Sequence, residues 1–209
     1  LDNDGDQDLV VGLLGGVAIA SNENGKRFQL RQMLPTSKDV TTLSAADFDQ
    51  DGDLDIYAAV YYADDVIFAA DEAGGPASAR NLVYHDANIG GHNALLRNDI
   101  SNGSWNFVDA TKETGLEMSS HRYSLASAWE DFDNDGDQDL LVAFHGGIIV
   151  ASNEDGQRFK VRTIIPSDKH LMSLAAADYD NDGDLDIYAT AFLTQWRGET
   201  GAPIPQQPR

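Results

Sequence analysis

The sequence contains no cysteine and few basic residues. The absence of cysteine excludes a disulfide-stabilised scaffold, a thiolate zinc site and a cysteine nucleophile. No apolar run approaches the roughly 18 residues that a membrane-spanning helix needs, so we expect no membrane insertion. Only 14 Lys and Arg oppose 35 Asp and Glu among 209 residues, which gives a formal net charge of -21. Because such a charge repels phosphate backbones and anionic membrane surfaces, we also expect no nucleic-acid partner.

The acidic residues are concentrated in four similar segments. Three are complete copies of the pattern D-x-D-x-D-G-D-x-D and begin at Asp47, Asp131 and Asp178. The fourth, at residues 2–8, lacks the first position of the pattern. Together they hold 19 of the 35 acidic residues. These candidate metal ligands are Asp2, Asp4, Asp6, Asp8, Asp47, Asp49, Asp51, Asp53, Asp55, Asp131, Asp133, Asp135, Asp137, Asp139, Asp178, Asp180, Asp182, Asp184 and Asp186.

The spacing of these carboxylates is typical of a calcium-binding loop. Ca²⁺ takes about six to eight oxygen ligands, and carboxylates at positions 1, 3, 5 and 9 of a tight loop converge on one point. Glycine at position 6 permits the sharp turn, and position 7 offers its backbone carbonyl. Magnesium is less suitable, since it prefers a small octahedral shell that keeps several waters. The sequence therefore predicts three to four Ca²⁺ ions per chain, at most one for each motif; a solvated acidic turn is the alternative.

An EF-hand does not fit the same motifs. Its loop needs a bidentate glutamate at position 12, where the three complete copies have Ala58, Val142 and Ala189. Apolar, tyrosine and β-branched residues follow each motif, and these favour a strand over the exit helix of an EF-hand. We therefore expect each loop to connect two strands.

An internal repeat organises the chain. Residues 1–62 align without a gap to residues 132–193, and 34 of the 62 pairs are identical. The 47-residue step from Asp131 to Asp178 contains strand-like alternation and a hairpin signal at Asn153–Gly156. The pattern predicts an all-β fold built from propeller-type blades of four antiparallel strands.

The repeat also predicts a division of the chain into units. We expect one repeat domain over residues 1–209. It should contain about four blades' worth of chain, as in a partial ring or a fragment of a larger propeller. Within it, two blades together form a supra-repeat of 131 residues. The calcium loops should lie on one face, and an insertion at 61–92 should emerge on the opposite face as a recognition or assembly surface. The blade-like units are about 1–46, 47–130, 131–177 and the incomplete 178–209.

The motif and the strand after it, as in Leu54–Ala58, resemble the FG-GAP/VCBS repeats, which are related to the calcium-binding blades of integrin α-subunits. The stretch Ala94–Leu116, with Ser124–Ala143 after it, resembles the cartilage-acidic-protein-like branch and its bacterial secreted relatives. The resemblance covers nearly the whole chain except about 61–92 and 198–209. It implies calcium-binding propeller blades in an extracellular or cell-surface protein of bacterial origin. The literal F-G and G-A-P signatures of integrin blades are absent as a pair.

Three functions fit these features. The first is a calcium-binding extracellular module with a structural, adhesion or interaction role, in which calcium stiffens the loop between the first and second strands of each blade. Its partners would be other protein chains, copies of itself or surface glycans. The second is a self-assembling surface or fibre protein, since similar units can stack head to tail. The third is a catalytic or non-catalytic propeller of a secreted polysaccharide-acting enzyme.

Catalysis is the function that we do not expect. The sequence contains no Gly-x-Ser-x-Gly elbow and no glycine-rich phosphate loop. A cluster of His85, Asp86 and His92 in the insertion offers ligands for a transition metal, but a solvated loop is the better explanation. The aspartates recur in regular motifs that each contain a glycine. This recurrence favours structural calcium ligands over pairs of catalytic carboxylates.

Overall fold

The structure is a computed structural model that describes residues 1–61, 90–119 and 122–192. These residues form strands and one 3₁₀ turn, η2 (Leu116–Ser119), and contain no α-helix. This confirms the predicted all-β class. The strands are β1 (Leu9–Leu13), β2 (Gly16–Asn22), β3 (Phe28–Pro35), β4 (Val40–Ala46), β5 (Asp55–Val60), β6 (Ala94–Asn98), β7 (Phe107–Asp109), β8 (Ser124–Glu130), β9 (Asp139–Glu154), β10 (Arg158–Ala177) and β11 (Asp186–Phe192).

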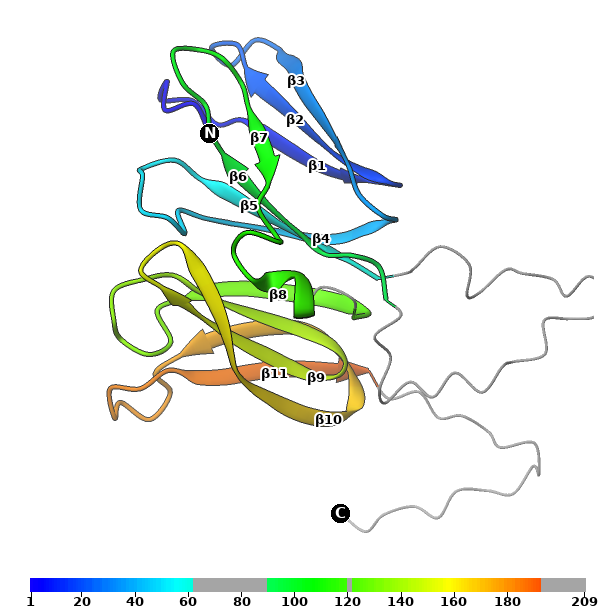
Figure 1. Ribbon diagram of the computed structural model, residues 1–209, viewed down its shortest axis with the longest axis vertical. Helices are drawn as coiled ribbons and strands as arrows, with labels where there is room; N and C mark the ends of the chain where they lie inside the picture. The colour runs from blue at the N-terminus through cyan, green and yellow to red at the C-terminus, as the bar shows by residue number, and fades with distance from the viewer. Residues whose placement is uncertain (62–89, 120–121, 193–209) are drawn as a thin grey trace, which may run out of the picture.

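The strands form three antiparallel sheets. Their orders are β1-β2-β3, β4-β5-β6-β7 and β11-β10-β9-β8. Figure 1 shows the sheets following one another along the long axis of the molecule, in an open row rather than a closed ring. The acidic loops before β1, β5, β9 and β11 all lie along one side of this row (Figure 1), as predicted. The arrangement agrees with a partial set of propeller-like blades.

The internal repeat of the sequence is also a repeat of strand register. Val17 pairs with Leu34 between β2 and β3, and the residues 131 positions later, Ile148 and Ile165, pair between β9 and β10. The next strand pair repeats the register too, because Leu43↔Ala58 corresponds to Leu174↔Ala189. The boundaries of the individual units stay a prediction.

The third sheet differs from the expected sequence of short strands. β9 runs through His145 and Gly146, where the first copy turns at Leu14 and Gly15. Its first part pairs with β8 and its second part with β10, while the last part of β10 pairs with β11. His145, which replaces Leu14 of the first copy, pairs with His170 of β10, so the strand pairing extends past the position of that turn. The Nε2 atoms of these two histidines are 3.1 Å apart.

Apolar side chains fill the spaces between successive sheets. Val17 and Ile19 of the first sheet pack with Ile56, Leu96 and Phe107 of the second. Because the first and third sheets cover both faces of β5, every residue of that strand is buried. Burial of a large apolar side chain contributes about 1.5–3 kcal/mol, so these interfaces hold the row together.

An aromatic cluster joins the second and third sheets. Phe48 and Phe159 have ring centroids 5.7 Å apart, and Trp129 lies 5.9 Å from Phe159 and 6.4 Å from Tyr57. Phe48 is the second residue of an acidic loop and is 1% exposed. The packing of Phe48 therefore anchors that loop to the core between the sheets.

The insertion predicted at 61–92 lies mostly outside the described residues. Its two ends are described and are close together, since Gly91 N–H donates to the carbonyl oxygen of Tyr61 at 3.4 Å. Val60 N–H also donates to Asn93 Oδ1 at 2.8 Å. The segment thus leaves β5 and returns to β6 at one place. Its predicted role as a recognition surface stays a prediction.

Candidate metal centres

The backbone of the acidic loops explains their sequence pattern. Position 4 has a left-handed conformation in every copy, with φ between 57° and 61° at Gln50, Asn134 and Asn181. Position 6 is always glycine, and its φ is 94° at Gly52 and 99° at Gly136. Few residues with a side chain adopt such angles, and glycine does so at little cost. The glycine therefore turns the chain so that the carboxylates before and after it meet.

Backbone N–H groups hold the carboxylates in place. Asp47 Oδ1 accepts from Asp51 N–H and its Oδ2 accepts from Gly52 N–H, both at 3.0 Å. Asp51 Oδ1 accepts from Asp53 N–H at 2.9 Å. The loops that begin at Asp131 and Asp178 repeat all three hydrogen bonds with distances of 2.9–3.1 Å. The loop is therefore preorganised by its own backbone.

Three carboxylates meet in each complete loop, at positions 1, 3 and 9. In each group one oxygen from every carboxylate lies within 4.8 Å of the others. Two oxygens bound to one Ca²⁺ at about 2.4 Å are at most about 4.8 Å apart, so the spacing suits a shared ion. The groups are Asp47, Asp49 and Asp55; Asp131, Asp133 and Asp139; and Asp178, Asp180 and Asp186.

A buried carboxylate oxygen points to a positive ligand. Asp49 Oδ1 is buried and has no hydrogen-bond partner. A buried oxygen of this kind costs free energy unless a hydrogen bond or a cation compensates it. The donor set consists of hard oxygen ligands, which bind Ca²⁺ and Mg²⁺ in preference to softer metals. The residues at the site therefore fit a bound calcium ion.

The electrostatics of the loops agree with that interpretation. Burial raises the pKa of Asp55 to about 7, although N–H groups of Asn98 and Phe48 donate to its carboxylate and oppose the change. Burial likewise raises the pKa of Asp139. The pKa of Asp49 is raised first by burial and then by the charge of Asp51. Crowded, poorly solvated carboxylates are unfavourable in their charged form, and a bound cation would reverse this.

Nine of the 19 predicted ligands belong to these three groups, and the others lie outside them. Position 5 stabilises the turn by accepting from the N–H of position 7, and the position 7 side chains of Asp53 and Asp137 accept hydrogen bonds from the preceding loop. In the first motif, Asp8 accepts from the amino group of Leu1 at 2.8 Å and from Asn22 N–H at 2.9 Å. Within the described part of the chain, Asp2, Asp4, Asp6 and Asp8 form no group of three ligand atoms. Ligation by all 19 aspartates stays a prediction.

Two buried asparagines support the loops and were not predicted. The N–H groups of Asn98 and Asn153 donate to Asp55 and Asp139, the position 9 carboxylates, at 2.8 and 2.7 Å. Asn22 makes the corresponding bond to Asp8. The sequence does contain one signal for this role, because Asn22 matches Asn153 in the internal repeat. From the sequence alone, however, that match is interpreted as part of a hairpin turn.

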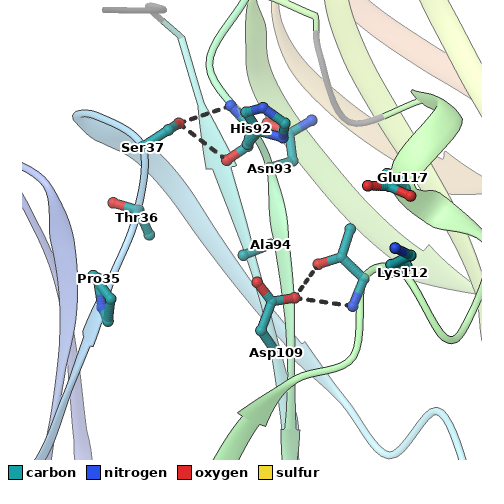
Figure 2. Close-up of a pocket in the computed structure, with 10 residues that line it drawn as sticks. Pro35, Thr36, Ser37, His92, Asn93, Ala94, Asp109, Lys112 and Glu117 are labelled. Atoms are coloured by element: carbon teal, nitrogen blue, oxygen red, sulfur yellow. Dashed lines mark hydrogen bonds between the residues drawn. The ribbon is translucent and has the colours of Figure 1, made fainter.

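A separate polar pocket of about 290 Å³ lies between the end of β3, the start of β6 and the segment after β7 (Figure 2). Its polar groups hold the backbone together: Ser37 Oγ accepts from His92 N–H at 2.8 Å, and Asp109 Oδ1 accepts from Thr111 N–H at 3.0 Å. His92 is the one member of the predicted histidine cluster that the structure describes; His85 and Asp86 lie outside the described residues. The pocket in Figure 2 is therefore built by structural hydrogen bonds, and no residue of the acidic loops lines it.

The sheets and loops together define an all-β repeat protein with acidic loops that recur on one side. A family model described as an FG-GAP-like repeat matches residues 1–58 and 131–189, more than half of the chain. The chain therefore belongs to the FG-GAP-like repeat family. A search of curated proteins found no match. In the described residues, no helix has the length and apolar character to cross a membrane.

Proposed function

We propose that this chain is a calcium-binding repeat module of an extracellular protein, with a structural, adhesion or interaction role and no catalytic activity. The observation that carries the proposal is that the same three carboxylate positions converge in three separate loops. A bound ion would fix the connection between β4 and β5, between β8 and β9, and between β10 and β11. It would also compensate part of the net charge of -21.

The exposure of the loops favours the extracellular setting. The group at Asp178, Asp180 and Asp186 is exposed, and the group at Asp131 is only partly buried. Extracellular modules bind calcium with dissociation constants of about 10⁻⁴–10⁻³ M, an affinity that open loops of this kind can reach. The bacterial origin inferred from the sequence belongs to the same proposal.

A titration of metal-free protein tests the calcium assignment. We expect calorimetry to give three to four Ca²⁺ per chain, with magnesium binding at least tenfold more weakly because these loops do not impose a small octahedral shell. Asp131→Asn combined with Asp133→Asn removes two ligands of one group and should lower the stoichiometry by one. Fewer than two bound calcium ions in the unsubstituted protein would refute the assignment.

A second function, self-assembly, is supported by the two ends of the row. Leu9, Val11 and Leu13 of β1 are about 40% exposed. Their counterparts in the repeat, Leu140, Val142 and Phe144 of β9, are buried in the core that packs against Tyr57 and Phe48.

The opposite end carries the complementary surface. Tyr179 and Tyr188, the counterparts of Phe48 and Tyr57, are 87% and 72% exposed. The two ends thus expose the halves of an interface that the molecule already forms internally, and head-to-tail association of copies would bury both.

Sizing in calcium at rising protein concentration tests this second function. We expect oligomers that dissociate when Tyr188→Lys introduces a charge into the exposed end. A monomer at all concentrations, for the unsubstituted chain, would exclude assembly and leave the calcium proposal untouched.

A further inference from the structure

The amide side chain at position 4 of each acidic loop reaches the next loop. Asn3 Nδ2 donates to the carbonyl oxygen of Gly52 at 3.2 Å and to Asp53 Oδ1 at 2.5 Å. Gln50 Nε2 makes the same two bonds to the following loop, to Gly136 at 3.1 Å and to Asp137 at 2.5 Å. In both pairs the donor is position 4, and the acceptors are positions 6 and 7 of the next loop.

The third pair of loops is linked by the bond to position 6. Asn134 Nδ2 donates to the carbonyl oxygen of Gly183 at 3.4 Å. The four loops are thus connected in series by three amide side chains. Turn geometry alone explains asparagine at these positions, because it tolerates left-handed backbone. It does not explain Gln50, which has the same φ of 58° as Asn3, so the shared property is the amide.

A second, buried link joins the first three of these loops. Asn153 Nδ2 donates to Phe48 of the loop that begins at Asp47, at 2.8 Å, and to Gln138 of the loop that begins at Asp131, at 3.3 Å. Asn98 bridges the first two loops in the same register, through the carbonyl oxygens of Leu1 at 3.1 Å and Leu54 at 3.2 Å. Neighbouring loops therefore share hydrogen bonds both at the surface and in the core.

The acceptors of the surface link keep their positions only while the loop that contains them is well ordered. Gly52 is held by its N–H bond to Asp47, a member of the metal group, and Asp53 is held by its N–H bond to Asp51. Without a cation, repulsion among the clustered carboxylates would loosen this segment. The position 4 amide would then lose both of its acceptors. The link is therefore strongest between two ordered loops, which is the condition for coupling between sites.

We propose that neighbouring calcium sites bind cooperatively, with the position 4 amide as a coupling residue that is not itself a ligand. This inference rests on the proposed calcium-binding function. The position 7 side chain acts as the acceptor of the coupling bond, which agrees with its absence from the groups of three carboxylates in the described residues. Calcium bound at one loop would order the acceptors of that loop, which the preceding loop uses. It would also order the position 4 donor of that loop, which binds the next loop.

Calcium titration of Gln50 variants tests the coupling. Gln50→Met keeps the length of the side chain and removes the amide, and we expect a lower Hill coefficient and about fivefold weaker binding at the two adjoining sites. Gln50→Asn is the rescue variant, because asparagine makes this link from Asn3 and Asn134, and it should retain the cooperativity. Asn181→Met places the same methionine in the last loop, where no bond to another loop is described, and should leave the Hill coefficient unchanged.

The outcomes separate this proposal from the one on which it rests. Absence of calcium binding in the unsubstituted protein refutes the calcium function itself. Calcium binding with a Hill coefficient of one, unchanged by Gln50→Met, refutes the coupling alone. If Gln50→Met does not fold in saturating calcium, as judged by circular dichroism, Asn134→Ser provides the same test at the next pair of loops.

Discussion

Asn153 illustrates how a residue outside the acidic motif determines the shape of the site. Its N–H group binds the carboxylate of Asp139, while its side chain binds two carbonyl oxygens from two different loops. It is 1% exposed, so water cannot replace these bonds. Asparagine supplies donors that an apolar residue of similar size lacks.

Removal of the Asn153 side chain should destabilise the fold. Asn153→Ala leaves the carbonyl groups of Phe48 and Gln138 without that donor, at a cost of about 1–3 kcal/mol for each buried group left unsatisfied. Chemical denaturation in saturating calcium measures the loss. Asn106→Ala, at an exposed asparagine, is the matched control and should change stability by less than about 0.5 kcal/mol. Equal effects of the two substitutions would contradict the bridging role.

The residue at position 2 of the acidic loops is buried in one copy and exposed in another, so the second copy serves as a control for a substitution in the first. Phe48→Ala removes a ring that packs on Phe159 between two sheets, and we expect a loss of about 3–5 kcal/mol in unfolding free energy. Tyr179 occupies the same position in the last loop and is 87% exposed. Tyr179→Ala should therefore have almost no effect on the stability of the chain. Comparable losses at both positions, measured by thermal unfolding, would show that the loop residue acts locally and not through the core.

At the scale of the elements, β5 and β6 form a hairpin whose long connection can be shortened. Tyr61 and Gly91 are joined by a backbone hydrogen bond, so replacing residues 62–89 with a short turn should preserve the pairing of Ala58 with Ala94. We expect the shortened chain to fold and to bind calcium as before, while it loses the self-association or ligand binding that depends on the insertion rather than on the exposed ends of the row. Circular dichroism, calcium titration and sizing provide the three measurements.

The shortened chain also tests whether the insertion belongs to the core. Loss of calcium binding at the loop that begins at Asp131 would show that residues 62–89 support the third sheet. The prediction of a separate recognition surface would then be wrong. A change in sizing alone, with calcium uptake intact, would support it.

Sequence reasoning predicted the elements whose causes are local. The loop conformation follows from glycine at position 6 and from the alternation of aspartates, and the gapless repeat predicted the equal register of Val17↔Leu34 and Ile148↔Ile165. It could not predict the continuous strands β9 and β10, which pair His145 with His170, because both residues differ from their counterparts in the first copy, Leu14 and Asp39.

The support that the loops receive from elsewhere in the fold was also hidden in the sequence. Asn98 lies 43 residues beyond Asp55, the carboxylate that it binds, and the insertion separates the two. The amide at position 4 is visible in every motif, but its acceptors belong to another loop. Both contacts arise only when the sheets stack and bring successive loops together.

At the scale of the whole molecule, the fold places its densest negative charge along one side. Figure 1 shows the four acidic loops in a row there, and the chain carries a net charge of -21. Mutual repulsion along this row opposes the stacking of the sheets, and bound cations would offset part of it. Calcium should therefore stabilise the whole row of sheets, because an ion that binds only the folded state shifts the unfolding equilibrium.

Thermal unfolding with and without a chelator, with the metal content measured on the same samples, tests this account most directly. At millimolar free calcium, about tenfold above a dissociation constant of about 10⁻⁴ M, three independent sites would add about 4 kcal/mol, and we expect the melting temperature to rise by roughly 10 °C or more over the calcium-free protein. Magnesium at the same concentration should restore only a small part of the rise. An unchanged melting temperature, in protein shown to have lost its calcium, would contradict the claim that the acidic loops are calcium sites that hold the fold together.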